Sequence, residues 1–369
     1  MDASPESNTL DARSCLGEAG TVQRLRASLA TLDLGERPLV LCGYSGGADS
    51  LALLGALIEL GRVGLIRVHA VHVDHGARLG SVEDAQRAVD AADRLGVPIT
   101  LIRLSLSVLE GGSGLGVEET LRRARYLAFR DAFEKTGAHV LALGHHQRDQ
   151  AETVILHLLR GSGIRGASGM RAFVRSDIPW WKPAPGDHSP DAIVVPVWRP
   201  FLSESAHDVR AFAGSLDVPI IEDPSNLDPA FRRNAIRHEV LPTLEAIAPG
   251  AVANLARFAR FAGDDSDELE RQAHEALMTA VSPRALGRGW LVGHPVAIQR
   301  RVVRRWFERS AAGVELSANR VEQVLTVART SGGDREIEVG SGWSVFVTKD
   351  VLSIAGPDSD SRRSGSPAP

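Results

Sequence analysis

Apolar and polar positions follow two different patterns along the chain, and the change falls near residue 217. Up to about residue 202, short β-branched and aliphatic runs are separated by segments of helical length, which is typical of βαβ units around a parallel sheet. This pattern predicts a Rossmann-like, open parallel sheet of about five strands in an α/β domain. The predicted strands are 39–42, 66–73, 99–104, 140–143 and 193–197, and the predicted helices are 50–60, 81–95, 118–136 and 150–159.

The second half of the chain has mainly helical spacing, which predicts a helical C-terminal domain with a terminal β-hairpin. The helices are expected at 233–247, 250–281, 295–311 and 319–329, and the hairpin at 335–339 and 344–354. Both ends of the chain are small and polar, and such segments bury too little apolar area to order themselves. We therefore expect a flexible tail (1–20), an α/β domain (21–215), a connecting helix (216–248), a helical domain (249–356) and a disordered tail (357–369).

Composition and charge narrow the class of protein. The 369 residues include 42 Lys or Arg and 46 Asp or Glu, and a formal net charge of -4 argues against a generic polyanion binder. No apolar run approaches the roughly 18 residues of a membrane span, and the N-terminus lacks the features of a signal peptide. We expect a cytoplasmic protein with no membrane partner. The two cysteines, Cys15 and Cys42, exclude a disulfide framework or a cysteine metal cluster.

The strongest local signal is Ser45-Gly46-Gly47-Ala48-Asp49-Ser50, which follows the first predicted strand and opens a helix. Two glycines allow several backbone N–H groups to point at one anion, and the helix adds its positive end. Asp49 would repel phosphates unless a cation lies between them, so we infer a bridging Mg²⁺. The alternative is a plain strand-to-helix connection with an N-cap. No Gly-Lys-Ser/Thr string occurs, which excludes a Walker loop.

Two other predicted strands end in polar residues that should face this loop, because parallel strands share one crevice at their carboxyl ends. The second strand ends in His72, Asp74 and His75, and the fourth leads through His145 and His146 to Asp149 at a helix start. We expect Asp149 to be a second metal ligand or to position substrate. Capping of the helix alone could explain Asp149, but it does not explain the His145-His146 pair directly before it. His72, Asp74 and His75 do not match a known zinc spacing.

Two groups of arginines are candidate phosphate contacts. Arg232, Arg233 and Arg237 have helical spacing, and the alternative is a solvated helix start with Asp223 and Glu239 as ion partners. A second stripe, Arg300, Arg301, Arg304, Arg305 and Arg309, is backed by apolar residues on the opposite helix face; a solvated arginine-rich surface explains it as well.

The loop at 45–50 resembles the pyrophosphate loop of the ATP pyrophosphatases. The whole series of motifs resembles the tRNA(Ile)-lysidine synthetase family over about residues 35–245, with a weaker likeness through 296–354. That series comprises Ser45 to Ser50, Val73-Asp74-His75-Gly76, Arg123-Ala124-Arg125-Tyr126, Gly144-His145-His146, Asp149 to Thr153, Arg160-Gly161-Ser162-Gly163, Arg199-Pro200, Asp223-Pro224-Ser225-Asn226 and Arg233-Asn234. One position departs from the family pattern, because Arg148 stands where the first of two adjacent acidic residues is usual.

The resemblance implies an adenine nucleotide alpha hydrolase-like fold and an ATP-dependent ligase. Such an enzyme adenylylates the wobble cytidine of the CAU-anticodon tRNA(Ile), and free L-lysine then displaces AMP to give lysidine. The implied catalytic residues are Asp49, Asp149, Arg125 and His145, with Asp49 and Asp149 holding Mg²⁺. The implied ATP contacts are Ser45, Gly46, Gly47, Ala48, Asp49, Ser50, His72 and Gly144, and the expected tRNA contacts are Arg232, Arg233, Arg237, Arg301 and Arg305.

Three other functions share parts of this pattern: a sulfur-transferring tRNA enzyme, a small-molecule amide synthetase, and a tRNA-binding protein with an inert nucleotide fold. The first needs reactive cysteines, for which Cys15 and Cys42 are badly placed. The second makes no use of the arginine-bearing helical domain, and the third would be consistent with Arg148. A homodimer is the expected assembly.

Overall fold

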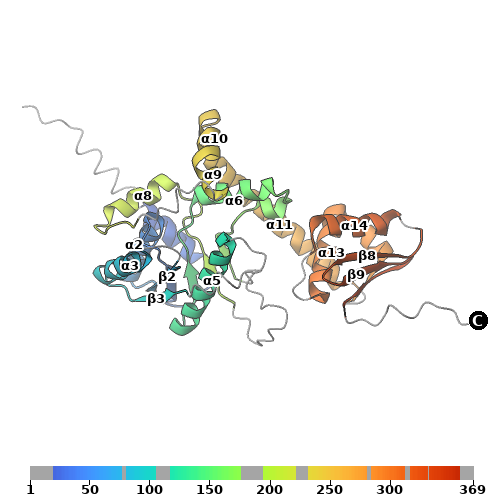
Figure 1. Ribbon diagram of the computed structural model, residues 1–369, viewed down its shortest axis with the longest axis horizontal. Coiled ribbons are helices and arrows are strands. Elements are labelled where there is room, and N and C mark those ends of the chain that lie inside the picture. The colour runs from blue at the N-terminus through green and yellow to red at the C-terminus, as the bar shows by residue number, and fades with distance from the viewer. Residues whose placement is uncertain are drawn as a thin grey trace, which may run out of the picture. The chain divides into compact units, whose positions relative to one another are not determined.

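The computed structural model describes residues 20–76, 80–104, 117–175, 194–221, 232–280, 284–311, 316–330 and 332–357. They divide into two compact units, and the boundary between Gly263 and Asp264 falls inside a long helix, α11 (Ala251–Met278) (Figure 1). Each unit has its own buried apolar core. Among the described residues no helix is both long and apolar enough to cross a membrane.

The first unit is built on a six-stranded sheet with the order β3-β2-β1-β4-β6-β5. Five strands are parallel, which confirms the predicted α/β fold, and the added strand β5 pairs antiparallel with β6. The last predicted strand, 193–197, is found two residues long and shifted toward the C-terminus. The strands are β1 (Leu39–Gly43), β2 (Arg67–Asp74), β3 (Ile99–Arg103), β4 (Val140–Ala142), β5 (Phe173–Val174) and β6 (Val197–Trp198).

Helices cover both faces of this sheet, as the alternation of side chains along β1 requires. Val40 and Cys42 face a core formed with the helix at 20–30, α2 (Ala48–Arg62), α3 (Ser81–Arg94) and α8 (Ala206–Ser215). Leu41 faces the opposite core, to which α5 (Val117–Thr136) contributes Tyr126 and Phe129. The helix at 20–30 and α8 were not predicted.

The order of strands places the site. β1 lies between β2 and β4, so the connections leave β1 and β4 in opposite directions and open a crevice at their carboxyl ends, where ligands bind in such sheets. The phosphate loop follows β1, and α6 (Gln147–Leu159) follows β4. The short helix α7 (Ile164–Ala167) comes next in the chain.

The predicted helix at 233–247 is present but interrupted by a π-helical turn. It consists of α9 (Arg232–Ala235), the π-helical segment η3 (Ile236–Val240) and α10 (Leu241–Ile247). Ile236 and Leu241 are buried against Ala151 of α6. This packing brings the segment against the helix that begins at the end of β4.

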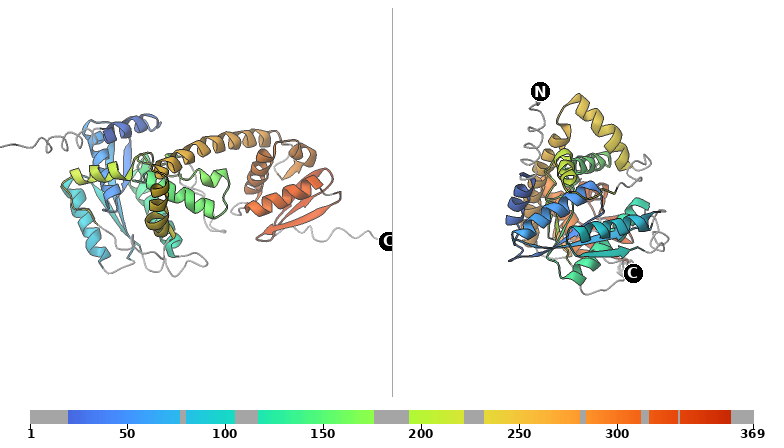
Figure 2. Two further views of the ribbon diagram at one scale, coloured as in Figure 1. Left: turned by 90° about the horizontal axis from the view of Figure 1, so that it is seen from above. Right: turned by 90° about the vertical axis from the view of Figure 1, so that its left-hand side faces the viewer.

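The second unit contains helices and a four-stranded antiparallel sheet with the order β7-β10-β9-β8. The predicted hairpin is confirmed, but its second strand, 344–354, is two strands in the structure, because Thr348 accepts and donates hydrogen bonds with Val351 and turns the chain. α14 packs on β8 and β9 (Figure 2). The elements are β7 (Ala285–Gly287), α12 (Arg288–Val292), α13 (Val296–Ser310), α14 (Ala318–Thr330), β8 (Arg335–Gly340), β9 (Trp343–Val347) and β10 (Val351–Ala355).

Candidate active site

The phosphate loop is a closed turn held by two serine hydroxyls. The Ser50 hydroxyl accepts the Ser45 N–H at 3.1 Å, donates to the Gly47 carbonyl at 2.9 Å, and lies 3.1 Å from the Ser45 hydroxyl. Gly46 has φ +85°, a conformation that favours glycine. Gly47 is the N-cap of α2, where no side chain accepts a hydrogen bond from the first turn. The N–H groups at the start of α2 are therefore not satisfied by an N-cap side chain, and anion binding there stays a prediction.

A distant segment closes on this loop. The Ile221 N–H donates to the Gly46 carbonyl at 2.9 Å, and a Cβ on Gly46 would lie 2.4 Å from Ile221 Cδ1. Gly46 is thus favoured for a second reason besides its φ, because a Cβ there would collide with the Ile221 side chain. The motif at 223–226, and with it Asp223, lies outside the described residues.

Gly144 carries the chain from β4 past the loop. A Cβ at this position would lie 2.7 Å from the Asp49 carbonyl oxygen and 3.0 Å from its carbon. Both are backbone atoms of the first turn of α2, so they have little freedom to move aside. Gly144 is therefore needed for the close approach of the two connections that form the crevice.

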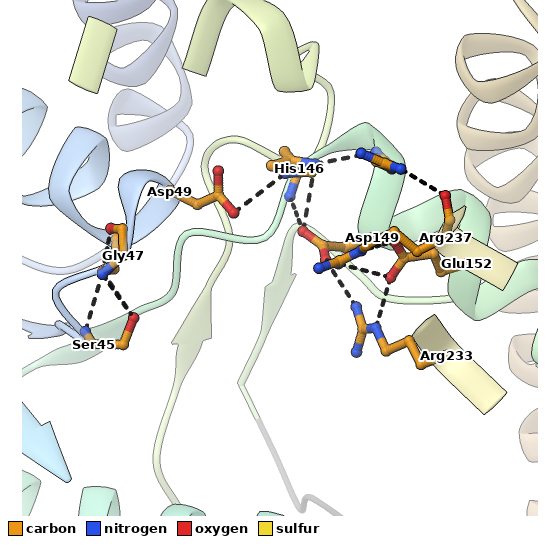
Figure 3. A network of polar contacts seen from close by, with 10 residues as sticks. Ser45, Gly47, Asp49, His146, Asp149, Glu152, Arg233 and Arg237 are labelled. Carbon is orange, nitrogen blue, oxygen red and sulfur yellow. Dashed lines mark hydrogen bonds and ion pairs between the residues drawn. The ribbon is translucent and has the colours of Figure 1, made fainter. Parts of the chain in front are cut away.

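His146 joins the two halves of the site, a role that its place in the Gly144-His145-His146 motif did not predict. Its Nε2 lies 3.5 Å from Asp49 Oδ2, and its Nδ1 lies 3.4 Å from Asp149 Oδ2 (Figure 3). Its Nδ1 also accepts the Arg148 N–H at 3.2 Å, so it caps α6 in a capping box. Burial lowers the pKa of His146, but the hydrogen bond to Asp49 and the charge of Asp149 outweigh it and raise that pKa. An unusual histidine N-cap three residues before Asp149 was the available signal.

Behind His146, two acidic residues of α6 meet two arginines of the helical segment after residue 231. Asp149 Oδ1 accepts from Arg233 at 2.9 Å and from Arg237 at 3.0 Å. Glu152, which is 0% exposed, accepts from Arg233 Nε at 2.7 Å and from Arg237 Nε at 2.6 Å (Figure 3). Burial raises the pKa of Asp149, but His146 and Arg233 reverse this and hold it well below its usual range. We call these four residues the acid–arginine cluster.

The ion partners of Arg233 and Arg237 differ from those that the sequence suggested. Arg233 and Arg237 were expected to contact tRNA, with Asp223 and Glu239 as alternative ion partners, whereas their guanidinium groups lie on Asp149 and Glu152. Arg232 is exposed. The tRNA-binding roles of these three arginines stay predictions.

The carboxylates fit a bound Mg²⁺ unequally. Asp49 Oδ1 is buried and has no hydrogen-bond partner among the described residues, so it is a ready ligand. Asp149 has both oxygens engaged, Oδ1 by the arginines and Oδ2 by the His146 N–H at 3.0 Å. In the described part of the chain no three His, Cys, Asp or Glu side chains gather into a metal site. One protein carboxylate completed by phosphate oxygens and water suits Mg²⁺; direct ligation by Asp149 stays a prediction.

Three other residues of the first unit were predicted to belong to the site: His72, His145 and Arg125. His72 is buried, with Nδ1 2.9 Å from the Tyr44 carbonyl directly before Ser45. Burial holds the pKa of His145 well below its usual value, and its buried Nδ1 has no partner in the part of the chain that is described. Arg125 is exposed, and its Nε donates to His75 Nε2 at 3.1 Å. Burial therefore favours the neutral form of His145, and its role beside the reacting base or AMP stays a prediction.

Arg148, the departure from the expected motif, contacts the backbone of the segment that carries Arg233 and Arg237. Its Nη2 donates to the backbone carbonyl of Arg237 at 2.6 Å. The positive charge of Arg148 therefore lies beside the acid–arginine cluster, where it interacts with Glu152 and Asp149.

The arginine stripe of the second unit is less accessible than expected. Arg301 is only 9% exposed, because it lies on the side of α13 that faces Glu270 of α11. Arg305 Nε donates to Glu270 at 2.6 Å. Both arginines are ion-paired in the structure, and their contact with tRNA stays a prediction.

Comparison with known proteins identifies the family. A family model for the PP-loop domain matches residues 21–244, and one for the TilS substrate binding domain matches residues 290–347. A tRNA(Ile)-lysidine synthase of Streptomyces coelicolor is 39% identical over 294 residues, which is 78% of this chain and 76% of that relative. The chain belongs to the tRNA(Ile)-lysidine synthase family. A relative from Salinispora arenicola is 36% identical over 90% of this chain and 95% of its own length, and one from Deinococcus deserti is 34% identical, but only 52% of it is covered.

A solved structure supports the fold. The U34-tRNA thiolase NcsA from Methanococcus maripaludis, solved with its [4Fe-4S] cluster, is similar with a TM-score of 0.53 at 17% identity, covering 67% of this chain and 80% of the other. This likeness confirms the open parallel sheet of the first unit.

Proposed function

We propose that this member of the tRNA(Ile)-lysidine synthase family attaches free L-lysine to the 2-position of the wobble cytidine of the CAU-anticodon tRNA(Ile). The product, lysidine, changes the codon read from AUG to AUA. The observation that carries the proposal is the phosphate loop joined through His146 to the acid–arginine cluster at one sheet edge, in a chain that matches the family in both units.

The reaction has two steps. The cytidine 2-oxygen attacks the α-phosphorus of ATP, and the bond to the β-phosphate breaks to release pyrophosphate. The neutral ε-amine of lysine then attacks C2, the C2–O bond breaks, AMP leaves with the oxygen, and a proton is lost from the nitrogen. Adenylylation turns a poor leaving group into a good one.

We assign the loop amides and the Ser45 hydroxyl to the β- and γ-phosphates, which carry the charge that develops on pyrophosphate. Asp49 would hold Mg²⁺, which supplies neutralising charge there when bound. His146 supports the proposal as the residue that orients Asp49, because its Nε2 lies 3.5 Å from Asp49 Oδ2 while its other nitrogen is fixed at the start of α6. His145 and Arg125 keep their expected roles beside the reacting base and the phosphates as part of this proposal.

The second unit and the remaining partners complete the proposal. Residues 290–347 match a substrate-binding domain, and we assign the body of the tRNA to this unit, with Arg305 among its contacts. The domain limits inferred from the sequence, the cytoplasmic location and a homodimer belong to the same proposal.

The sulfur-transfer alternative is disfavoured by the one cysteine that is described. Cys42 is buried in β1, and burial raises the pKa of its thiol far above the usual value, so it is unsuited to form a thiolate.

The test is incubation with ATP, Mg²⁺, labelled lysine and bulk tRNA. We expect lysine-dependent label in tRNA and AMP release, both lost in Asp49→Ala. Glu59→Gln, an exposed acidic residue later in α2, is the matched control and should behave as wild type. Label uptake by Asp49→Ala at the wild-type rate would contradict the metal role. ATP–pyrophosphate exchange without RNA would instead favour a small-molecule synthetase, and tRNA binding without AMP release would favour an inert binding protein.

A further inference from the structure

A backbone carbonyl in the acid–arginine cluster lacks the partner that its helix would normally supply. In η3 the hydrogen bonds run from residue i+5 to residue i, as in the bond from the Leu241 N–H to the Ile236 carbonyl. The next bond in this series would come from residue 242 to the carbonyl of Arg237. Residue 242 is a proline and has no N–H, so the helix leaves the Arg237 carbonyl without its donor.

Arg148 supplies the missing donor. Its Nη2 lies 2.6 Å from the Arg237 carbonyl oxygen and bridges 89 residues of sequence. Arg148 stands in the first turn of α6, directly before Asp149. The same turn therefore holds Arg237 twice, through its backbone by Arg148 and through its guanidinium by Asp149.

This arrangement fixes the side chain of Arg237 relative to the acidic residues. A π-helical turn has weaker and more widely spaced backbone bonds than an α-helix and often occurs at functional sites. With its carbonyl anchored, η3 cannot unwind without breaking a charge-assisted hydrogen bond from a partly buried guanidinium.

We propose that Arg148 is a positioning residue, which acts through Arg237 by replacing the backbone donor that Pro242 cannot provide. The inference rests on the proposed function for its kinetic test, but its structural test is independent of that function. Arg148 holds η3 in the geometry that places Arg237 on Asp149 and Glu152.

The primary variant is Arg148→Met, which keeps a flexible unbranched stem but removes the guanidinium group and its donors. We expect kcat/KM for lysidine formation to fall roughly ten- to hundredfold, because small displacements of positioned groups have effects of that size. Arg62→Met, an exposed arginine at the end of α2, is the matched control and should match wild type. Hydrogen exchange of the 236–241 amides should accelerate at least tenfold in Arg148→Met, with the α2 amides unchanged.

Two further variants distinguish this role from direct contact with substrate. Pro242→Ala restores an N–H at residue 242, so the Arg148→Met change should have less than a threefold effect on kcat/KM and on exchange in that background. In an Arg237→Gln background, Arg148→Met should likewise add little, because residues acting through one another are not additive.

The outcomes separate the inference from the function. Undiminished losses in both the Pro242→Ala and Arg237→Gln backgrounds would overturn the inference and indicate that Arg148 contacts substrate itself. Wild-type exchange at 236–241 in Arg148→Met would overturn it as well. Absence of lysidine formation by the wild-type chain would refute the proposed function, while the exchange measurements would still decide the role of Arg148.

Discussion

Glu152 offers the sharpest test of how the acid–arginine cluster stabilises the first unit. We consider Glu152→Gln, which preserves the shape of the side chain but removes its charge and turns one acceptor into a donor. Wild-type Glu152 accepts three N–H groups, from Arg233 Nε at 2.7 Å and from Arg237 Nε and Nη2 at 2.6 and 3.0 Å. At least one of these contacts becomes donor against donor in the variant.

The size of the effect follows from the burial of the pair. Breaking one partner of a buried ion pair costs about 3–5 kcal/mol. The arginine side chains are 24% and 22% exposed and keep Asp149, so part of their charge stays compensated. We therefore expect a loss of about 3 kcal/mol, a large share of the roughly 5–15 kcal/mol that stabilises a typical domain.

Native-state hydrogen exchange measures this loss in the unit itself. The slowest amides of α2, around the buried Leu53 and Leu54, report the opening of the whole core. The control is Glu59→Gln: the Glu59 side chain is 42% exposed and pairs with Arg62 on the surface, so the effect should be within about 0.5 kcal/mol. If Glu152→Gln lowers the opening free energy by less than about 1 kcal/mol, the cluster is not the stabilising contact that its geometry indicates.

Three further predictions concern other residues. Gly144→Ala should raise the KM for ATP roughly tenfold, because its Cβ would meet the Asp49 backbone at 2.7 Å; an unchanged KM would show that the loop can shift. Burial depresses the pKa of His145, so the folded state keeps this histidine neutral at pH values where the unfolded state is already protonated. The free energy of unfolding should therefore be unaffected by this group above the unfolded pKa of about 6.5, and should decrease by up to about 1.4 kcal/mol per pH unit below it. Urea titrations at several pH values should show a shallower acid dependence in His145→Gln. Glu270→Gln should release Arg305 and tighten tRNA binding several-fold at low salt, with a steeper salt dependence in a filter-binding assay; weaker or unchanged binding would count against tRNA contact by this arginine.

The sequence was most informative where function depends on local chain geometry. The phosphate loop could be placed because two glycines, flanking serines and an adjacent strand all lie within a dozen residues. The cluster could not, because Glu152 and its arginines are more than 80 residues apart and only the packing of η3 on α6 brings them together. The role of His146 was not predicted for a related reason, since it depends on two carboxylates from different elements.

The same distinction explains the errors in secondary structure. The turn at Thr348 contains no glycine or proline, so 344–354 looks like one continuous strand. The π-helical segment is only five residues long, which is too short for its hydrophobic pattern to differ from that of an α-helix. Pro242 was the one sign in the sequence that a regular helix is interrupted here.

The order in which the cluster is joined has a consequence for biosynthesis. Asp149 and Glu152 leave the ribosome more than 80 residues before Arg233 and Arg237, and neighbouring β4 and α6 are complete long before that. Until the arginine-bearing segment emerges, α6 lacks its packing partners Ile236 and Leu241 and also the arginines that pair with Asp149 and Glu152. The last step of domain closure is thus coupled to translation of the arginine-bearing segment, and a chain truncated before it should be a preferred substrate for proteolytic quality control.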